Sequence, residues 1–187
     1  MQVAKKPLEL SKIFPELEMI SDRSLRDKVA AVWEELWQES AYQDIEKVPT
    51  SPEIPYSHVP HNRCVLAMAL AIADAYERFH GVKTNRDVLI AAGLLQDASK
   101  IVEMQSKRDG TIEMSPKGKA YPHAFYAAHV ALKHGVPDEI CHIILTHSPQ
   151  SPKFPASLEG KILYYADQLD VIAIHKDRWI KDLFISK

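Results

Sequence analysis

Apolar residues recur at intervals of three and four along six stretches of the chain, which is the pattern of α-helices that bury one face. The six stretches cover about residues 22–40, 61–79, 84–97, 122–133, 137–147 and 158–174. Trp33 and Trp37 lie on the apolar face of the first stretch, where they either pack in the core or face a partner. We find no convincing strand alternation and no internal repeat. The pattern therefore predicts an all-α fold.

The stretch 84–97 is apolar on every side, because Val88, Leu89 and Ala91 point in different directions around a helix. A helix that is apolar all round is expected to be buried. It opens with a Thr-x-x-Asp capping signature at 84–87 and ends at Gln96 and Asp97. A buried carboxylate without a partner is costly, so Asp97 is expected to face a cation.

Prolines crowd residues 49–60 and 149–155, which predicts two rigid loops at the borders of the helical centre. Residues 107–119 carry charges and glycines without a period, so we expect an exposed loop with a short hairpin around Asp109 and Gly110. One compact domain is expected overall. It divides into an N-terminal helical extension with a proline-rich loop, 1–57, and a helical core, 58–187.

Composition and charge narrow the function classes. The 187 residues are 46% hydrophobic and carry a net charge of -2, which favours a packed core and gives no reason to expect nucleic acid as partner. The longest apolar run has ten residues, 64–73, whereas a membrane-spanning helix needs about 20. No secretory signal is apparent. Cys64 and Cys141 sit in apolar patterns and are expected to be buried thiols in a reducing, cytoplasmic setting.

Five residues that can bind a metal stand at helix ends or on apolar helix faces. They are His61, Asp97, His123, His147 and Asp167. Each alone is equally well explained as a cap, a surface residue or a buried polar group. As a set, imidazole nitrogens and carboxylates suit Fe, Mn, Zn, Co or Ni, and helices of a bundle can direct them into one pocket.

In this order the set resembles the HD-domain superfamily of metal-dependent phosphohydrolases. The family pattern is a His that opens a helix, a His-Asp pair that closes the next, two further His residues and a final Asp. Here the spacings between successive members of the set are 36, 26, 24 and 20 residues. The resemblance covers about residues 58–175 and implies that 58–187 is an HD-like helical core around a metal pocket.

One position departs from the family pattern, because Gln96 stands where the family has the His of its His-Asp pair. The resemblance implies one site that keeps His61, Asp97 and Asp167 but lacks a ligand. The second site, formed by Asp97, His123 and His147, is complete. Three interpretations stay open: the first metal is lost or weakened, Gln96 contacts the substrate instead, or His58 supplies a replacement ligand.

The resemblance implies a hydrolase that acts on a small, anionic, phosphate-ester-like substrate with one or two divalent transition ions. Asp97 would bridge the two ions. Lys100, which matches a family lysine, would act in catalysis and bind phosphate, although a lysine also suits a helix C-terminus. Arg63 is a second candidate for anion binding.

Other functions remain open at this point. Some HD proteins are di-iron oxygenases that use O₂, and some relatives hydrolyse or hydrate carbon–nitrogen bonds. A degenerate binding module without catalysis is a further alternative. We expect a small-molecule substrate, no membrane partner, and a homodimer as one candidate oligomeric state.

Overall fold

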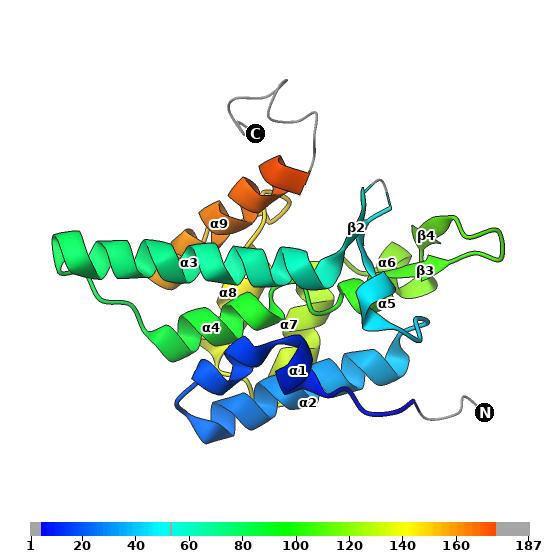
Figure 1. Cartoon of the computed structure of the whole chain (residues 1–187), viewed down its shortest axis with the longest axis horizontal. Helices are drawn as coiled ribbons and strands as arrows, with labels where there is room; N and C mark the ends of the chain where they lie inside the picture. The colour runs from blue at the N-terminus through cyan, green and yellow to red at the C-terminus, as the bar shows by residue number, and fades with distance from the viewer. Residues whose placement is uncertain (1–4, 53, 175–187) are drawn as a thin grey trace.

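Helices make up most of the chain (Figure 1). The structure is a computed structural model that describes residues 5–52 and 54–174. Its helices are α1 (Leu10–Ile13), η1 (Pro15–Met19), α2 (Arg23–Glu39), η2 (Ile45–Lys47), α3 (His58–His80), α4 (Arg86–Leu95), α5 (Lys100–Glu103), α6 (Pro116–Ala120), α7 (His123–Lys133), α8 (Asp138–Thr146) and α9 (Leu158–Ile174). Two short antiparallel strand pairs accompany them, β1 (Pro49–Ser51) with β2 (Ile54–Ser57) and β3 (Met104–Ser106) with β4 (Ile112–Met114). The predicted all-α class is confirmed.

Helix α4 forms the centre of the fold, as its apolar sequence predicts. It packs against α2, α3, α8 and α9, and every residue from Val88 to Leu95 is buried. Figure 1 shows it between α3 on one side and α2 on the other. Gly93 permits the close approach of α3, since a Cβ at this position would lie 2.9 Å from Leu66 Cδ1. The end of α4, where Asp97 follows, is thereby fixed inside the bundle.

The N-terminal segment shares this core. Trp33 is fully buried, and its indole Nε1 donates a hydrogen bond to the Leu94 carbonyl at 3.1 Å. Phe14 packs on the same indole with ring centroids 4.8 Å apart, and Trp37 is also buried. Both tryptophans therefore pack inside the chain. The boundary expected between 57 and 58 falls at the start of α3. The part of the predicted core after residue 174 lies outside the described residues.

Local details differ from the sequence expectations for identifiable reasons. Helix α3 begins at His58 because Pro60 falls in its first turn, where a proline costs no hydrogen bond. Asn85, not Thr84, caps α4 by accepting a hydrogen bond from the Val88 amide. The β1–β2 pair in the proline-rich segment was not predicted.

Two further expectations concern exposed segments. The hairpin expected around Asp109 and Gly110 is confirmed as β3–β4, with Gly110 at a φ of 82°. Both cysteines are free thiols, but only Cys141 is buried. Cys64 is exposed, so the expectation of two buried thiols was wrong. The apolar neighbours of Cys64 indicated burial, but its position on α3 turns it outward.

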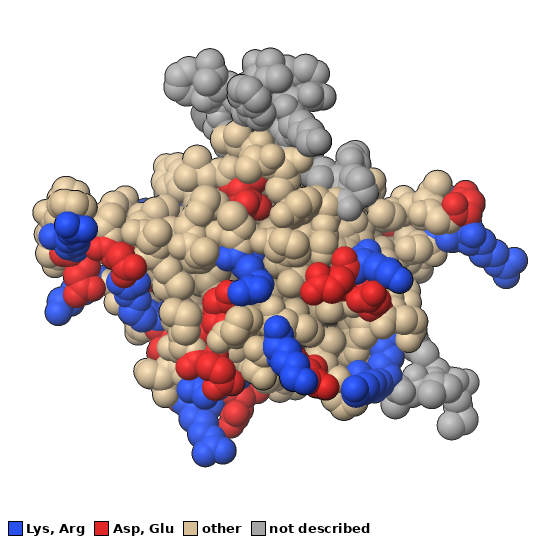
Figure 2. All heavy atoms as spheres, viewed as in Figure 1, with Lys and Arg blue, Asp and Glu red and all other residues tan. Residues whose placement is uncertain are grey.

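The surface carries charges of both signs. Figure 2 shows basic and acidic side chains interspersed over the face in view. Such a distribution creates no extended field of one sign on this face. Within the described ranges, no helix has both the length and the hydrophobicity required to span a bilayer.

Candidate metal centre

The five predicted ligands come from five different places in the bundle and meet in its interior. His61 lies near the start of α3, Asp97 just beyond the end of α4, and His123 is the first residue of α7. His147 follows the last residue of α8, and Asp167 lies within α9. All five side chains are buried. The packing of these helices around α4 therefore brings together residues that are more than a hundred positions apart.

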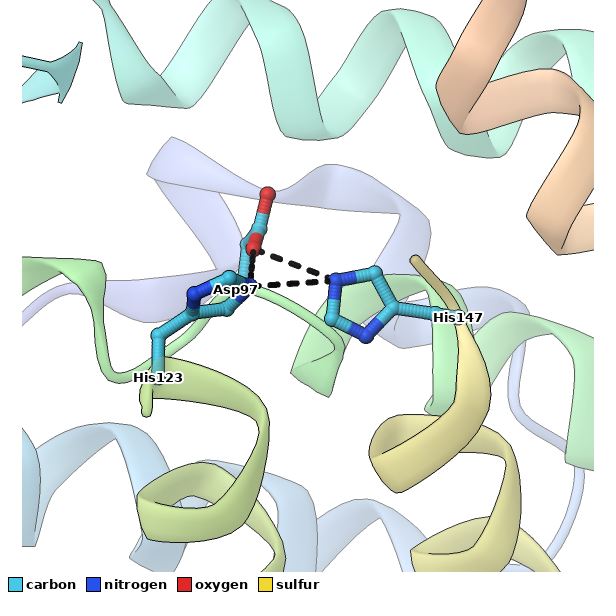
Figure 3. Close-up of side chains that lie close together, drawn as sticks. All are labelled: Asp97, His123 and His147. Atoms are coloured by element: carbon cyan, nitrogen blue, oxygen red, sulfur yellow. Dashed lines mark hydrogen bonds and ion pairs between the residues drawn. The ribbon is translucent and has the colours of Figure 1, made fainter. Parts of the chain in front are cut away.

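Asp97, His123 and His147 form one group of candidate ligands (Figure 3). The Nε2 atoms of His123 and His147 lie 3.3 and 3.5 Å from Asp97 Oδ1. The two Nε2 atoms are 3.4 Å from each other. Three potential ligand atoms, one from each residue, thus lie close enough together to bind one metal ion.

His61, Asp97 and Asp167 form a second group that shares Asp97 with the first. His61 Nε2 lies 3.2 Å from Asp97 Oδ2 and 3.4 Å from Asp167 Oδ1. The two oxygens of Asp97 therefore face different groups, Oδ1 toward His123 and His147 and Oδ2 toward His61. This arrangement would allow the Asp97 carboxylate to contribute one oxygen to each group.

The two groups fit divalent metal ions. Ligand atoms that are each about 2.1 Å from a tetrahedral ion lie roughly 3.4 Å apart, close to the spacings within both groups. Asp97 Oδ1 is buried without a hydrogen-bond partner among the described residues, as expected for an atom that binds an ion. Imidazole and carboxylate donors suit transition metals.

The comparisons with known proteins agree with this geometry. The family model for the HD domain matches residues 59–172. The chain belongs to the HD-domain family. It is 33% identical over 133 residues to the dihydroneopterin 2′,3′-cyclic phosphate phosphodiesterase of Methanocaldococcus jannaschii, with 67% of this chain and 52% of the relative covered. This HD protein thus spans about half the length of that curated relative. No solved structure matches this chain significantly.

The three candidate histidine ligands of this HD domain are held by their other ring nitrogen. Nδ1 of His61 lies 2.5 Å from Asp170 Oδ2, and Nδ1 of His147 lies 2.7 Å from the carbonyl of Ile144. Nδ1 of His123 lies 3.5 Å from Glu103 Oε1. The hydrogen bonds at Nδ1 of His61 and His147 favour the tautomer that leaves Nε2 free for a metal, and Glu103 is the nearby acceptor at Nδ1 of His123.

Burial and neighbouring charges set the protonation of this cluster. Burial opposes charge on His61, but the three facing aspartates outweigh it and raise the pKa of His61 to about 12. Burial likewise opposes ionisation of Asp97, yet the facing imidazoles of His147 and His61 hold its pKa well below the usual range. The three facing carboxylates thus stabilise the protonated form of His61. A metal must displace the proton of His61 to bind there.

The predicted anion-binding residues occupy different positions. Lys100, the first residue of α5, is mostly buried and pairs with Glu103 at 3.0 Å. Burial disfavours its charge, but Asp97 and Glu103 reverse this and raise its pKa. Arg63 instead pairs with Glu16 at 2.8 Å and is partly exposed, so in this structure it belongs to the α3–η1 contact. Its role in anion binding stays a prediction.

Three neutral polar side chains near the ligands are buried without hydrogen-bond partners among the described residues. They are His58, Asn62 and Gln96. His58 belongs to neither group of candidate ligands. Asn62 has no motif that would have identified it, and Gln96 is the position where the chain departs from the family pattern.

We expect Asp170→Asn to weaken metal binding by the group that contains His61. The amide keeps the shape but loses the charge that supports the imidazole, and loss of such a partner typically costs about 10–100-fold in metal affinity. Metal titration against a competing chelator measures this. Asp138→Asn, on the exposed start of α8, is the matched control. Unchanged affinity in Asp170→Asn would show that Asp170 does not support the ligand.

We also expect His58→Phe to make the metal-free protein less sensitive to acid. Burial lowers the pKa of His58 to about 3, against 6.5 ordinarily, so below pH 6.5 the unfolded chain takes up a proton that the folded chain refuses. Wild type should therefore lose stability as pH falls from 6.5 toward 3, by on the order of 4 kcal/mol from this group alone. Urea unfolding at several pH values in EDTA gives the slope of the free energy of unfolding against pH for wild type and for His58→Phe.

The control for this experiment is His80→Phe, which changes an exposed histidine at the other end of α3. It should keep the steep pH dependence of wild type. Equal slopes for wild type and His58→Phe would mean that His58 takes up its proton as readily in the folded protein as in the unfolded chain.

Proposed function

We propose that this HD protein is a metal-dependent hydrolase of small phosphodiesters. The convergence of two ligand groups on the shared Asp97 is the observation that carries the proposal. Family membership and the phosphodiesterase relative support it, and they do not favour oxygenation, carbon–nitrogen hydrolysis or a binding module. A cyclic phosphodiester of a small molecule is the substrate class that the relative's name suggests.

Each residue has a role in this proposal. When bound, a divalent metal would lower the pKa of a water molecule and polarise the phosphoryl oxygen. Asp97 would help to hold a metal in each group, together with His123 and His147 in one and with His61 and Asp167 in the other. Lys100 binds a phosphate oxygen in this proposal. The nearby carboxylates of Asp97 and Asp167 raise its pKa, so that its ammonium group stays charged beside the candidate ligands. Gln96, beside Asp97, either acts as a weak ligand in the group of His61 or contacts a neutral part of the substrate.

We propose Fe, Mn, Zn, Co or Ni as the metal, since all accept nitrogen and oxygen ligands. The free state of both cysteines is compatible with a cytoplasmic protein. The homodimer stays a prediction, which sedimentation velocity tests.

The test is hydrolysis of bis(p-nitrophenyl) phosphate and of a 2′,3′-cyclic nucleotide by protein stripped with EDTA and reloaded with each metal. We expect turnover only after reloading. Oxygen uptake with iron, and no phosphodiester cleavage, would replace the proposal with an oxygenase.

Lys100→Ala should lower kcat/KM for phosphodiesters by about tenfold or more, the effect of losing a hydrogen bond to a charged group. Steady-state kinetics of the reloaded protein measure this. Lys107→Ala is the matched control, because Lys107 pairs with Glu113 in the β3–β4 hairpin. Equal loss in both variants would remove Lys100 from the substrate site.

A further inference from the structure

Glu103 lies between two parts of the site that have separate roles in the proposed reaction. Its Oε2 lies 3.0 Å from Lys100 Nζ, and its Oε1 lies 3.5 Å from His123 Nδ1. One carboxylate thus faces the proposed phosphate-binding lysine with one oxygen and a candidate metal ligand with the other. The side chain is largely buried, so solvent screens these interactions little.

The backbone holds Glu103 firmly in this position. Its amide donates to the Ser99 carbonyl at 3.0 Å, and its carbonyl accepts from the Ser115 amide at 2.8 Å. Gly118 lies so close that an added Cβ would be 2.1 Å from the Glu103 carbonyl oxygen. Ser99 also donates its hydroxyl to the carbonyl of His123 at 2.7 Å. Glu103, Lys100 and His123 are therefore fixed relative to one another by the same short segment.

The charges around Glu103 make its two contacts competitive. Its two oxygens face different groups, Oε2 the ammonium of Lys100 and Oε1 the imidazole of His123. Its negative charge is shared between an ammonium group and an imidazole N–H. An anion that attracts Lys100 leaves more of this charge for His123, and a more strongly supported imidazole is a better metal ligand at Nε2.

We propose that Glu103 is a positioning residue that couples anion binding at Lys100 to metal binding by His123. The inference rests on the proposed role of Lys100 as an anion-binding residue. Coupling between two binding events is reciprocal, so metal in the group of His123 also raises the affinity for the anion. An empty site would thereby hold substrate weakly, and a loaded one would hold it tightly.

The experiment measures coupling without turnover. Mn²⁺ affinity is determined by electron paramagnetic resonance of free Mn²⁺, with and without inorganic phosphate, for wild type and Glu103→Gln. The ratio of the two affinities is the coupling factor. We expect a factor of about fivefold or more in wild type. In Glu103→Gln, which preserves shape but not charge, we expect it to fall to the value of Lys100→Ala.

A double variant completes the cycle. Adding Glu103→Gln to Lys100→Ala should leave the coupling factor of Lys100→Ala unchanged, because the lysine through which Glu103 acts is already gone. Glu113→Gln is the matched control, since Glu113 pairs with Lys107 in the exposed hairpin. It should keep the coupling factor of wild type.

The outcomes separate this inference from the proposed function. Wild-type coupling in Glu103→Gln, or weaker Mn²⁺ binding with unchanged coupling, overturns the inference, and so does the absence of any coupling in wild type. Coupling that depends on Glu103 in a protein without phosphodiesterase activity supports the inference and refutes the function. Should Glu103→Gln not fold, Glu103→Asp keeps the charge on a shorter side chain, and undiminished coupling in it overturns the inference.

Discussion

Asp97→Ala is expected to remove most of the bound metal and to abolish turnover. Asp97 is the residue that both ligand groups share, with Oδ1 facing His123 and His147 and Oδ2 facing His61. Its loss takes one ligand from each group and leaves the remaining imidazoles without their central anion. Metal content after loading, measured by elemental analysis, and phosphodiester hydrolysis test this.

Variants of residues that belong to only one ligand group distinguish the loss of a shared ligand from a general loss of metal binding. His123→Ala and His147→Ala should empty only the group to which they belong and leave metal bound by His61, Asp97 and Asp167. Asp109→Ala, in the turn of the exposed hairpin, should bind metal like wild type. Full metal content in Asp97→Ala would show that the bridging assignment is wrong.

The helices and the convergence of the five candidate ligands were predictable because both follow from local signals that packing reinforces. Long apolar periodic stretches such as 158–174 fix a helix and the face it buries. The all-round apolar stretch that ends at Asp97 already indicated a buried carboxylate in need of a cation. The structure places His61 of α3, His123 of α7 and His147, just beyond α8, against it.

The partners of those ligands were not predictable from one sequence. Asp170 and His61 are 109 residues apart, and an acidic residue one turn beyond Asp167 is equally typical of a solvated helix surface. The contact between Glu103 and His123 depends on the packing of α7, so the sequence alone did not indicate a role for Glu103. For Arg63, the sequence suggested a role that this structure does not display. A basic residue near a motif indicated an anion site, whereas Arg63 pairs with Glu16, a contact that depends on how η1 packs.

Gln96→His is expected to raise metal content toward two ions per chain. Gln96 follows the last residue of α4, is fully buried, and directly precedes Asp97. Both of its amide atoms lack a hydrogen-bond partner among the described residues. An imidazole presented from this helix end would add a ligand to His61, Asp97 and Asp167. Imidazole is a better donor to transition ions than a neutral amide oxygen.

The measurement is metals per chain for wild type and Gln96→His under the same loading conditions, with generic phosphodiesterase activity as a second readout. Gln105→His, in the hairpin, controls for a histidine that merely adds adventitious metal binding. Gln96→Met removes the amide at similar length and shows whether wild type uses it as a ligand. If Gln96 contacts the substrate instead, Gln96→His leaves stoichiometry unaltered and lowers activity, because the amide offers both a donor and acceptors that a metal-bound imidazole does not. Two ions per chain in both proteins would refute a weakened first site and leave Gln96 itself, or His58, as the ligand that completes it.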